Sequence, residues 1–147
     1  MNVFVILRIM IGGLFVFSGV EKLLHPYQNF LYVIQSYQCF DATIEELAAR
    51  VVPWVEFLTG AFLILGLWSR WALRSALVLF VCFILIVGQA IIRKLPIDKC
   101  GCFGEGLSLP LPAVLSLDTF LTLVTLVLLF RIQQSSAFSL DRYFERS

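Results

Sequence analysis

Long apolar stretches separated by short polar segments dominate this chain. Four of them approach the roughly 20 apolar residues that a helix needs to cross a bilayer, and they cover about residues 3–24, 47–67, 71–92 and 112–130. Because lipid offers no hydrogen bonds, each spanning segment has to satisfy its own backbone groups as a helix. The pattern predicts an all-α fold: a bundle of four transmembrane helices in a single membrane domain over 1–147, with a polar tail over 131–147.

The first two stretches carry additional local signals. The most apolar part of the second stretch runs from Pro53 to Leu67, which is short for a span. We therefore expect this helix to begin near Leu47 and to kink at Pro53. The first stretch has no basic residues before it and no small-residue cleavage site after it. We interpret it as a retained span and not as a cleaved signal peptide.

The segment between the first two spans, from His25 to Arg50, carries apolar residues on one helical face. This pattern predicts a short interfacial helix in the first extramembrane loop, lying across the mouth of the bundle. Tyr27, Tyr32 and Tyr37 are typical of the headgroup region. The helix has two interpretations: it is a surface anchor, or it is a cap that brings the following cysteine over the second polar loop.

Composition and charge narrow the class of protein. Hydrophobic residues make up 60% of the chain and charged residues only 14%, whereas soluble domains are about a quarter charged. The net charge is +1 and there is no block of basic residues to meet a phosphate backbone. These features exclude a soluble fold and a nucleic-acid partner, and they leave the lipid bilayer as the expected surroundings.

The orientation of the bundle follows from its charged loops. Four spans place both termini on one side of the membrane, and the very short link between the second and third spans carries Arg70 and Arg74 on that side. The positive-inside rule therefore favours cytoplasmic termini in a bacterial inner membrane. The loops that carry Cys39, Cys100 and Cys102 would then face the periplasm, where disulfides persist.

A pair of cysteines is the strongest chemical signal in the chain. It lies in the polar loop after the third span, within Lys99-Cys100-Gly101-Cys102-Phe103-Gly104. A disulfide between these two residues closes a small strained ring, and strained disulfides are the more oxidising and labile ones. With Cys39, the loops allow three pairings, each of which leaves one thiol free to attack a disulfide. Nearby basic residues favour the thiolate.

A less reactive interpretation remains open for the loop cysteines, and another applies to the fourth cysteine. Cys39 can form a plain staple to Cys100 or Cys102, with the third thiol idle. The fourth cysteine, Cys82, lies in the third span, where we expect inert buried core. No metal site is predicted, because two thiolates and a distant His25 do not make a normal zinc ligand set.

Polar and small residues follow one face of the first span. Arg8, Gly12, Phe15, Gly19 and Lys22 recur every three or four residues, which places them on one stripe of a helix. Glycines in such a stripe let a neighbouring helix approach closely. We therefore expect a packing seam along this stripe.

A layer of polar side chains is predicted beneath the cysteine loop, in the outer part of the bundle. Its members are Glu21, Lys22, Glu56, Gln89 and Asp118. Charges inside a membrane are costly, so such a layer marks either an ion-paired scaffold or a proton route beside a redox centre. We expect Lys22 and Glu56 to pair, because an unpaired carboxylate at this depth would be neutral instead.

Four motifs occur in order along the chain: Arg8-x3-Gly12-x2-Phe15-x2-Ser18-Gly19-x2-Lys22-Leu23, then Tyr37, then Pro53-x2-Glu56-x3-Gly60, then Cys100-Gly101-Cys102-Phe103-Gly104. In these motifs the chain resembles the MauE branch of the DoxX-like integral membrane family. The resemblance implies a redox-associated membrane protein that works with a periplasmic thioredoxin-like partner. It also implies kinship with four-helix thiol oxidoreductases of the quinone-linked kind. Quinone is therefore the one cofactor that the resemblance suggests. Those relays use two cysteine pairs, whereas this chain has three loop cysteines.

The leading functional hypothesis is a thiol-disulfide oxidoreductase or redox carrier that supports disulfide formation or maturation of exported proteins. Cys100 and Cys102 would cycle between dithiol and disulfide, while Cys39 resolves or stores a mixed disulfide. Gly101, Phe103 and Gly104 would shape the loop. The alternatives are a non-catalytic assembly subunit with a stapled loop, or a bundle that binds a small solute or lipid in its polar layer.

Overall fold

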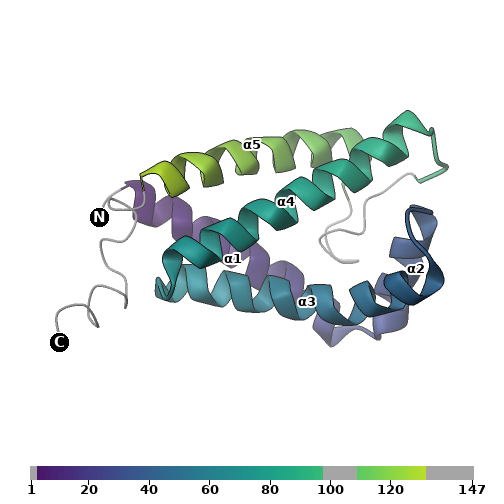
Figure 1. Cartoon of the computed structure of the whole chain (residues 1–147), viewed down its shortest axis with the longest axis horizontal. Helices are drawn as coiled ribbons and strands as arrows, with labels where there is room; N and C mark the ends of the chain where they lie inside the picture. Colours follow the sequence, from purple (N-terminus) through teal and green to yellow (C-terminus); the bar gives the residue numbers. More distant parts are fainter. Residues whose placement is uncertain (1–2, 98–108, 132–147) are drawn as a thin grey trace.

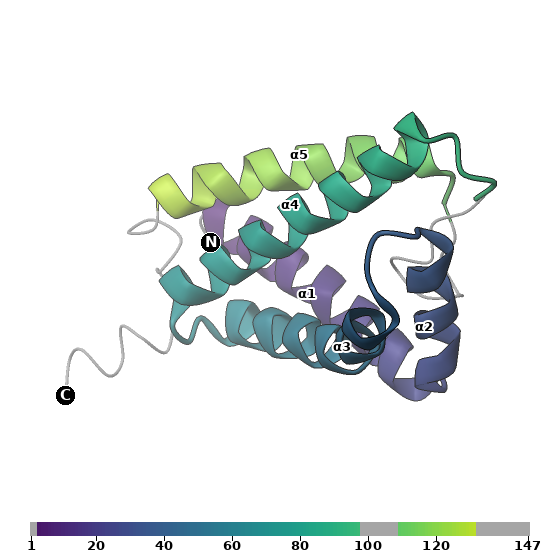
Figure 2. The same cartoon turned by 45° about the vertical axis from the view of Figure 1, so that its right-hand side comes forward.

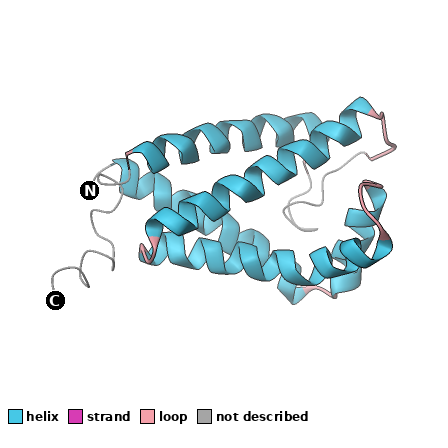
Figure 3. Cartoon of the chain, in the orientation of Figure 1, coloured by secondary structure: helices cyan, strands magenta, loops and turns pink. Residues whose placement is uncertain are grey.

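The computed structural model describes residues 3–97 and 109–131, and these residues form an all-helical bundle (Figures 1 and 3). Four of its helices are long and apolar enough to cross a membrane, so the predicted four-span fold is confirmed. The helices are α1 (Val3–Leu24), α2 (Tyr27–Ser36), α3 (Ala42–Leu65), α4 (Ser69–Ile92) and α5 (Leu111–Phe130).

The ends of α3 differ from the sequence-based expectation. The helix begins at Ala42, five residues before the predicted start, and Pro53 lies inside it as expected. Glu45 lies in the first turn of α3, where an acidic side chain stabilises the helix N-terminus. The helix ends at Leu65 and is capped by Gly66, whose φ of 67° is the left-handed conformation that glycine adopts without strain. The tight turn that follows starts α4 at Ser69.

The helices form two antiparallel pairs, α1 with α3 and α4 with α5, which lie one above the other in Figure 1. The start of α1 and the end of α5 lie at the same end of the bundle. At the opposite end α2 lies across the bundle and packs on α3 (Figure 2). The short helix predicted in the first extramembrane loop is therefore present, and it covers one mouth of the bundle.

Glycines hold α1 and α3 at backbone contact distance. A Cβ atom built at Gly60 of α3 would lie 2.6 Å from the carbonyl oxygen of Gly12 and 2.6 Å from the backbone nitrogen of Val16. A Cβ at Gly19 would lie 2.7 Å from the backbone nitrogen of Phe57. Real Cβ atoms do not approach backbone this closely, so the packing seam expected on α1 is confirmed.

Replacing Gly60 by alanine is expected to lower the free energy of unfolding by about 1–3 kcal/mol, because the added methyl group would overpack the seam. Gly13 and Gly88 provide matched controls, since a Cβ there meets nothing within 4 Å. Alanine at those two sites is expected to stabilise the helix by up to about 1 kcal/mol. Unfolding in mixed micelles with increasing SDS, followed by circular dichroism, measures both. Equal effects at Gly60 and Gly13 would contradict the seam.

The structure corrects two sequence-based expectations about burial. Cys82 is exposed on the outer surface of α4, and not in the core as expected, because Phe80 and Val87 face inward and Cys82 lies about 200° round the helix from Phe80. Tyr37, expected in the headgroup region, is buried at 4% exposure. It follows the end of α2 and folds under that helix into an apolar cluster. Tyr32 is exposed, as expected.

That apolar cluster, which we call the outer cluster, fills the end of the bundle beneath α2. Its buried members come from the α2 end, α4 and the start of α5: Tyr37, Val87, Ala90, Leu111 and Val114. A second cluster fills the rest of the bundle, where the rings of Phe15 and Phe80 lie 4.9 Å apart between centroids. Several polar side chains of the spans are also buried, among them Lys22, Glu56 and Asp118.

Candidate functional site

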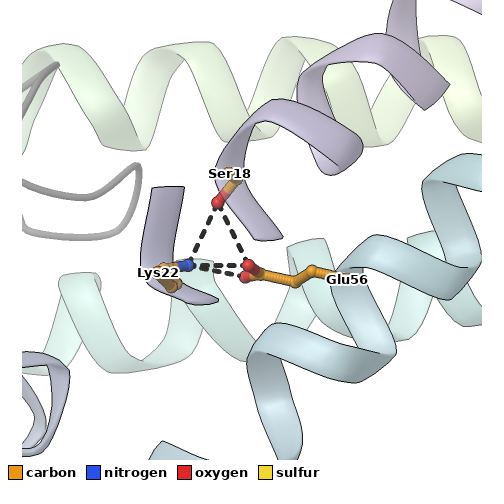
Figure 4. A network of polar contacts seen from close by, with 3 residues as sticks. All are labelled: Ser18, Lys22 and Glu56. Carbon is orange, nitrogen blue, oxygen red and sulfur yellow. Dashed lines mark hydrogen bonds and ion pairs between the residues drawn. The ribbon is translucent and has the colours of Figure 1, made fainter. Parts of the chain in front are cut away.

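A buried ion pair joins α1 to α3. The Lys22 ammonium lies 2.8 Å from both carboxylate oxygens of Glu56 (Figure 4). It also donates a hydrogen bond of 3.1 Å to the Ser18 hydroxyl, and that hydroxyl donates one of 3.1 Å to Glu56 Oε2. The side chains of Lys22 and Glu56 are 2% and 0% exposed. The pairing expected between these two residues is therefore confirmed.

Local geometry explains why Ser18, Lys22 and Glu56 can all bond to one another. Ser18 and Lys22 are four residues apart on α1 and share one face of the helix. Gly19, between them, brings α1 against the backbone of α3, so a side chain as short as serine reaches Glu56. Lysine donates three hydrogen bonds, and here three oxygens accept them. A buried charge pair is stable only when its polar atoms are satisfied in this way.

Aromatic rings complete the surroundings of the ammonium group. Lys22 Nζ lies 4.8 Å from the ring centroid of Phe30 on α2 and 5.5 Å from that of Phe83 on α4. A cation over the face of an aromatic ring is stabilised by the ring quadrupole. The capping helix and α4 thus cover the ion pair from two sides, so the pair is enclosed within the bundle.

Asp118 of α5 brings a second carboxylate close to this network. It is 1% exposed, and neither of its carboxylate oxygens has a hydrogen-bond partner in the described part of the chain. Asp118 interacts electrostatically with Lys22 and lines a cavity of about 10 Å³ together with Ser18 and Glu56. That volume is close to the minimum for one water molecule. The arrangement can hold a single water between two carboxylates.

Cys39 lies apart from the ion pair, at the α2 end of the bundle. Its thiol donates a hydrogen bond to Gln89 Oε1 of α4, and its side chain packs against the outer cluster. Arg93 holds the turn before it by donating a 3.2 Å hydrogen bond to the carbonyl oxygen of Gln38. The polar residues predicted as one layer therefore form two groups, because Gln89 joins Cys39 and not Lys22.

The surroundings of Cys39 favour the protonated, neutral form of its thiol. Burial raises the pKa of the Cys39 thiol, while the positive charge of Arg93 opposes the rise. Burial also raises the pKa of Tyr37 to about 12. Cys39 therefore carries its proton near neutral pH, which makes it a poor initial nucleophile because the thiolate is the reactive form.

Glu21 lies beside His25 at the end of α1. Its carboxylate is 3.9 Å from His25 Nδ1, one turn further along α1, and its side chain is 20% exposed. Adjacent residues on a helix are about 100° apart, so Glu21 leaves the face that carries Lys22. Its part in the predicted polar layer stays a prediction.

Five residues singled out in the sequence lie outside the described residues: Cys100, Gly101, Cys102, Phe103 and Gly104. The described chain ends at Ile97 on one side of them and resumes at Leu109 on the other, and both of these side chains pack against the outer cluster. Ser18 was absent from the predicted polar layer. Its spacing of four residues from Lys22 was the signal that could have revealed it.

Comparison with known proteins identifies a family. The family described as methylamine utilisation protein MauE matches residues 1–131. This range contains all five described helices, the Lys22–Glu56 pair and the two cysteine-bearing loops. Comparison with curated proteins and with solved structures returns no match. With four helices able to span a bilayer and a match over most of its length, this multi-pass membrane protein belongs to the MauE family.

Proposed function

We propose that this protein is a membrane thiol-disulfide redox protein that exchanges electrons with a periplasmic thioredoxin-like partner through Cys100 and Cys102. The observation that carries the proposal is the position of Cys39. It packs against the same outer cluster as Ile97 and Leu109, the two residues that flank the cysteine loop. The wider kinship with DoxX-like proteins stays a prediction.

Chain length supports an encounter between these sulfurs. Cys100 follows Ile97 by three residues, and three residues span at most about 11 Å. Cys39 and Ile97 are both anchored on the outer cluster. The C-G-C pair is therefore tethered, through the three residues that follow Ile97, to the cluster against which Cys39 packs.

The exchange proceeds through a mixed disulfide. The thiolate of Cys100 or Cys102 attacks one sulfur of the partner's disulfide and displaces the other as a thiolate. A second loop cysteine then attacks the mixed disulfide and releases the partner as a dithiol. Two electrons pass from the loop cysteines to the partner, and the two thiol protons end on the partner's sulfurs. The same steps in reverse oxidise the partner.

The two polar groups have distinct roles in this proposal. Cys39, neutral and held by Gln89, resolves or stores a mixed disulfide and does not make the first attack. Asp118 and Glu56, the carboxylate partner of Lys22, line a water-sized cavity, which supplies a place to hold a proton during turnover. The pair also holds α1 and α3 in register beneath the loops.

The orientation proposed from sequence agrees with this chemistry. The first turns of α4, just after the tight turn that follows α3, carry Arg70 and Arg74 at the end of the bundle opposite α2, and the positive-inside rule favours that end in the cytoplasm. The cysteines would then face the periplasm of a bacterial inner membrane. The family's description connects its members with methylamine utilisation, so we infer that exported proteins of that process are the recipients of the disulfide chemistry.

The pocket beside Cys39 does not fit a quinone in this structure. It is apolar, has a volume of about 80 Å³, and lies between Phe30, Phe40 and Phe83. Ligand pockets generally measure about 300–1,000 Å³. A quinone would supply a two-electron acceptor, but this pocket is too small to admit one, so no step is assigned to it.

Alkylation followed by non-reducing mass spectrometry tests the proposal. We expect a disulfide among Cys39, Cys100 and Cys102 whose occupancy changes across a series of glutathione redox buffers. Cys82, exposed on α4, serves as the internal control and should be reduced throughout. Loop cysteines that keep one state in every buffer would overturn the redox function.

A stapled assembly subunit is the second candidate. The raised pKa of Cys39 favours it, because a neutral, partly buried thiol is suited to a stable disulfide. Under this alternative the mapping experiment finds Cys39 bonded to one loop cysteine in every buffer. A solute-binding bundle has less support, because the cavity in the polar layer has room for only about one water.

A further inference from the structure

A groove runs between α3 and α4 at the end of the bundle where the two helices join, at the left in Figure 1. Its volume is about 480 Å³, six times that of the pocket beside Cys39. Leu58 and Phe62 of α3 form one wall, and Trp71 and Ser75 of α4 form the other. Both helices are membrane spans, so this largely apolar groove opens toward lipid.

Two arginines lie beside the groove. Arg70 and Arg74 are both exposed and lie four residues apart, on one face of the first turns of α4. The Arg74 guanidinium lies 5.1 Å from the ring centroid of Trp71, which lines the groove. Neither arginine forms an ion pair within residues 3–97 and 109–131. Like charges at this spacing repel each other, and a bound anion would relieve that repulsion.

We propose that the groove binds one acyl chain of an anionic phospholipid, with the headgroup phosphate held by Arg70 and Arg74. Guanidinium groups bind phosphate oxygens through paired hydrogen bonds. The start of α4 adds a positive helix end on the same side. Trp68 and Trp71, 67% and 65% exposed, place this end of the bundle at headgroup depth. The inference does not depend on the redox chemistry.

A second copy of the chain is a less suitable occupant. Most homodimers have a two-fold axis, which sets the same surface patch of each subunit against its counterpart. A two-fold contact across this groove would place the two Arg70–Arg74 pairs close together, and like charges across an interface are costly. A phospholipid, in contrast, supplies both the apolar chain and the negative charge that the groove and its rim lack.

Native mass spectrometry of the full chain, released from detergent in the presence of added lipid, tests the proposal. We expect one phosphatidylglycerol to be retained in preference to phosphatidylcholine of the same chain length. The double variant Arg70→Gln/Arg74→Gln should bind phosphatidylglycerol roughly 30-fold more weakly, from about 1 kcal/mol for each basic residue at the membrane surface. Inorganic phosphate alone should neither bind nor compete at equal concentration.

Matched variants separate the groove from general effects of charge and bulk. Arg131→Gln removes a charge after the last residue of α5, away from the groove, and should leave the retention of phosphatidylglycerol unchanged. Arg70→Gln alone and Arg74→Gln alone should each weaken the binding of phosphatidylglycerol about fivefold. Ser75→Trp should fill the groove and abolish retention, whereas Val78→Trp, on the lipid-exposed surface of α4, should not. Equal retention of both lipids, or a Ser75→Trp protein that still binds, would overturn the proposal. A dimer peak lost in Ser75→Trp would assign the groove to a second copy instead.

Discussion

Replacing Lys22 by methionine is expected to lower the free energy of unfolding by about 3–5 kcal/mol, the usual cost of removing one partner from a buried ion pair. Methionine preserves much of the length and apolar contact of lysine but donates no hydrogen bonds. Glu56, fully buried, would lose two contacts of 2.8 Å, and Ser18 would lose its donor. Titration with SDS in mixed micelles, followed by circular dichroism, measures the change.

Two controls show whether the pairing itself causes the loss. The double variant Lys22→Met/Glu56→Gln removes both charges, and we expect it to recover most of the stability because no uncompensated charge stays buried. Arg50→Met breaks the exposed 2.6 Å pair with Glu46 on α3 and should lower the free energy of unfolding far less, because solvent screens an exposed ion pair. If Lys22→Met costs no more than Arg50→Met, the pair does not stabilise the bundle.

Replacing Cys100 or Cys102 by serine is expected to abolish electron exchange with a thioredoxin-like partner, because a hydroxyl group cannot form the mixed disulfide. The partner is mixed with the protein in nanodiscs, and the rate at which the partner's redox state changes is measured by thiol alkylation and gel shift. Cys39→Ser is expected to slow resolution and to let the mixed disulfide accumulate. These outcomes distinguish the first attack from the later step.

The bundle itself should tolerate these changes. Cys82→Ser, on the exposed face of α4, should retain the full exchange rate and serves as the matched control. The free energy of unfolding of the Cys100→Ser and Cys102→Ser proteins, measured under reducing conditions, should stay close to that of the parent chain, because serine differs from cysteine only by an oxygen atom in place of sulfur. An exchange rate unchanged in both loop variants would rule out the proposed chemistry.

The spans were predictable because the bilayer imposes their length and composition. The first, third and fourth spans, expected over 3–24, 71–92 and 112–130, are α1, α4 and α5 with ends shifted by at most two residues. The start of α3 was missed by five residues. Its first turns contain Thr43 and two glutamates, so they carry no hydrophobic signal, although the backbone is helical there.

The Lys22–Glu56 pair was also accessible from sequence, because an isolated charge at that depth is too costly to persist. Its third member, Ser18, was indicated only by its spacing of four residues from Lys22, since serine carries no charge whose burial demands a partner. The same limit applies to Cys39, whose bond to Gln89 joins residues 50 positions apart. Nothing in the spacing of these two residues indicates that the loop after α2 faces α4.

The number of spans, the helical backbone, the glycine seam and the need for a buried counter-charge are all readable from the residues alone, because solvent and sterics demand each of these locally. The rotation of each helix about its own axis emerges only from the packed bundle. That rotation turns Cys82 outward and Tyr37 inward, and it divides the polar residues into two groups. It depends on the sum of many packing contacts between helices, which no single segment of the chain contains.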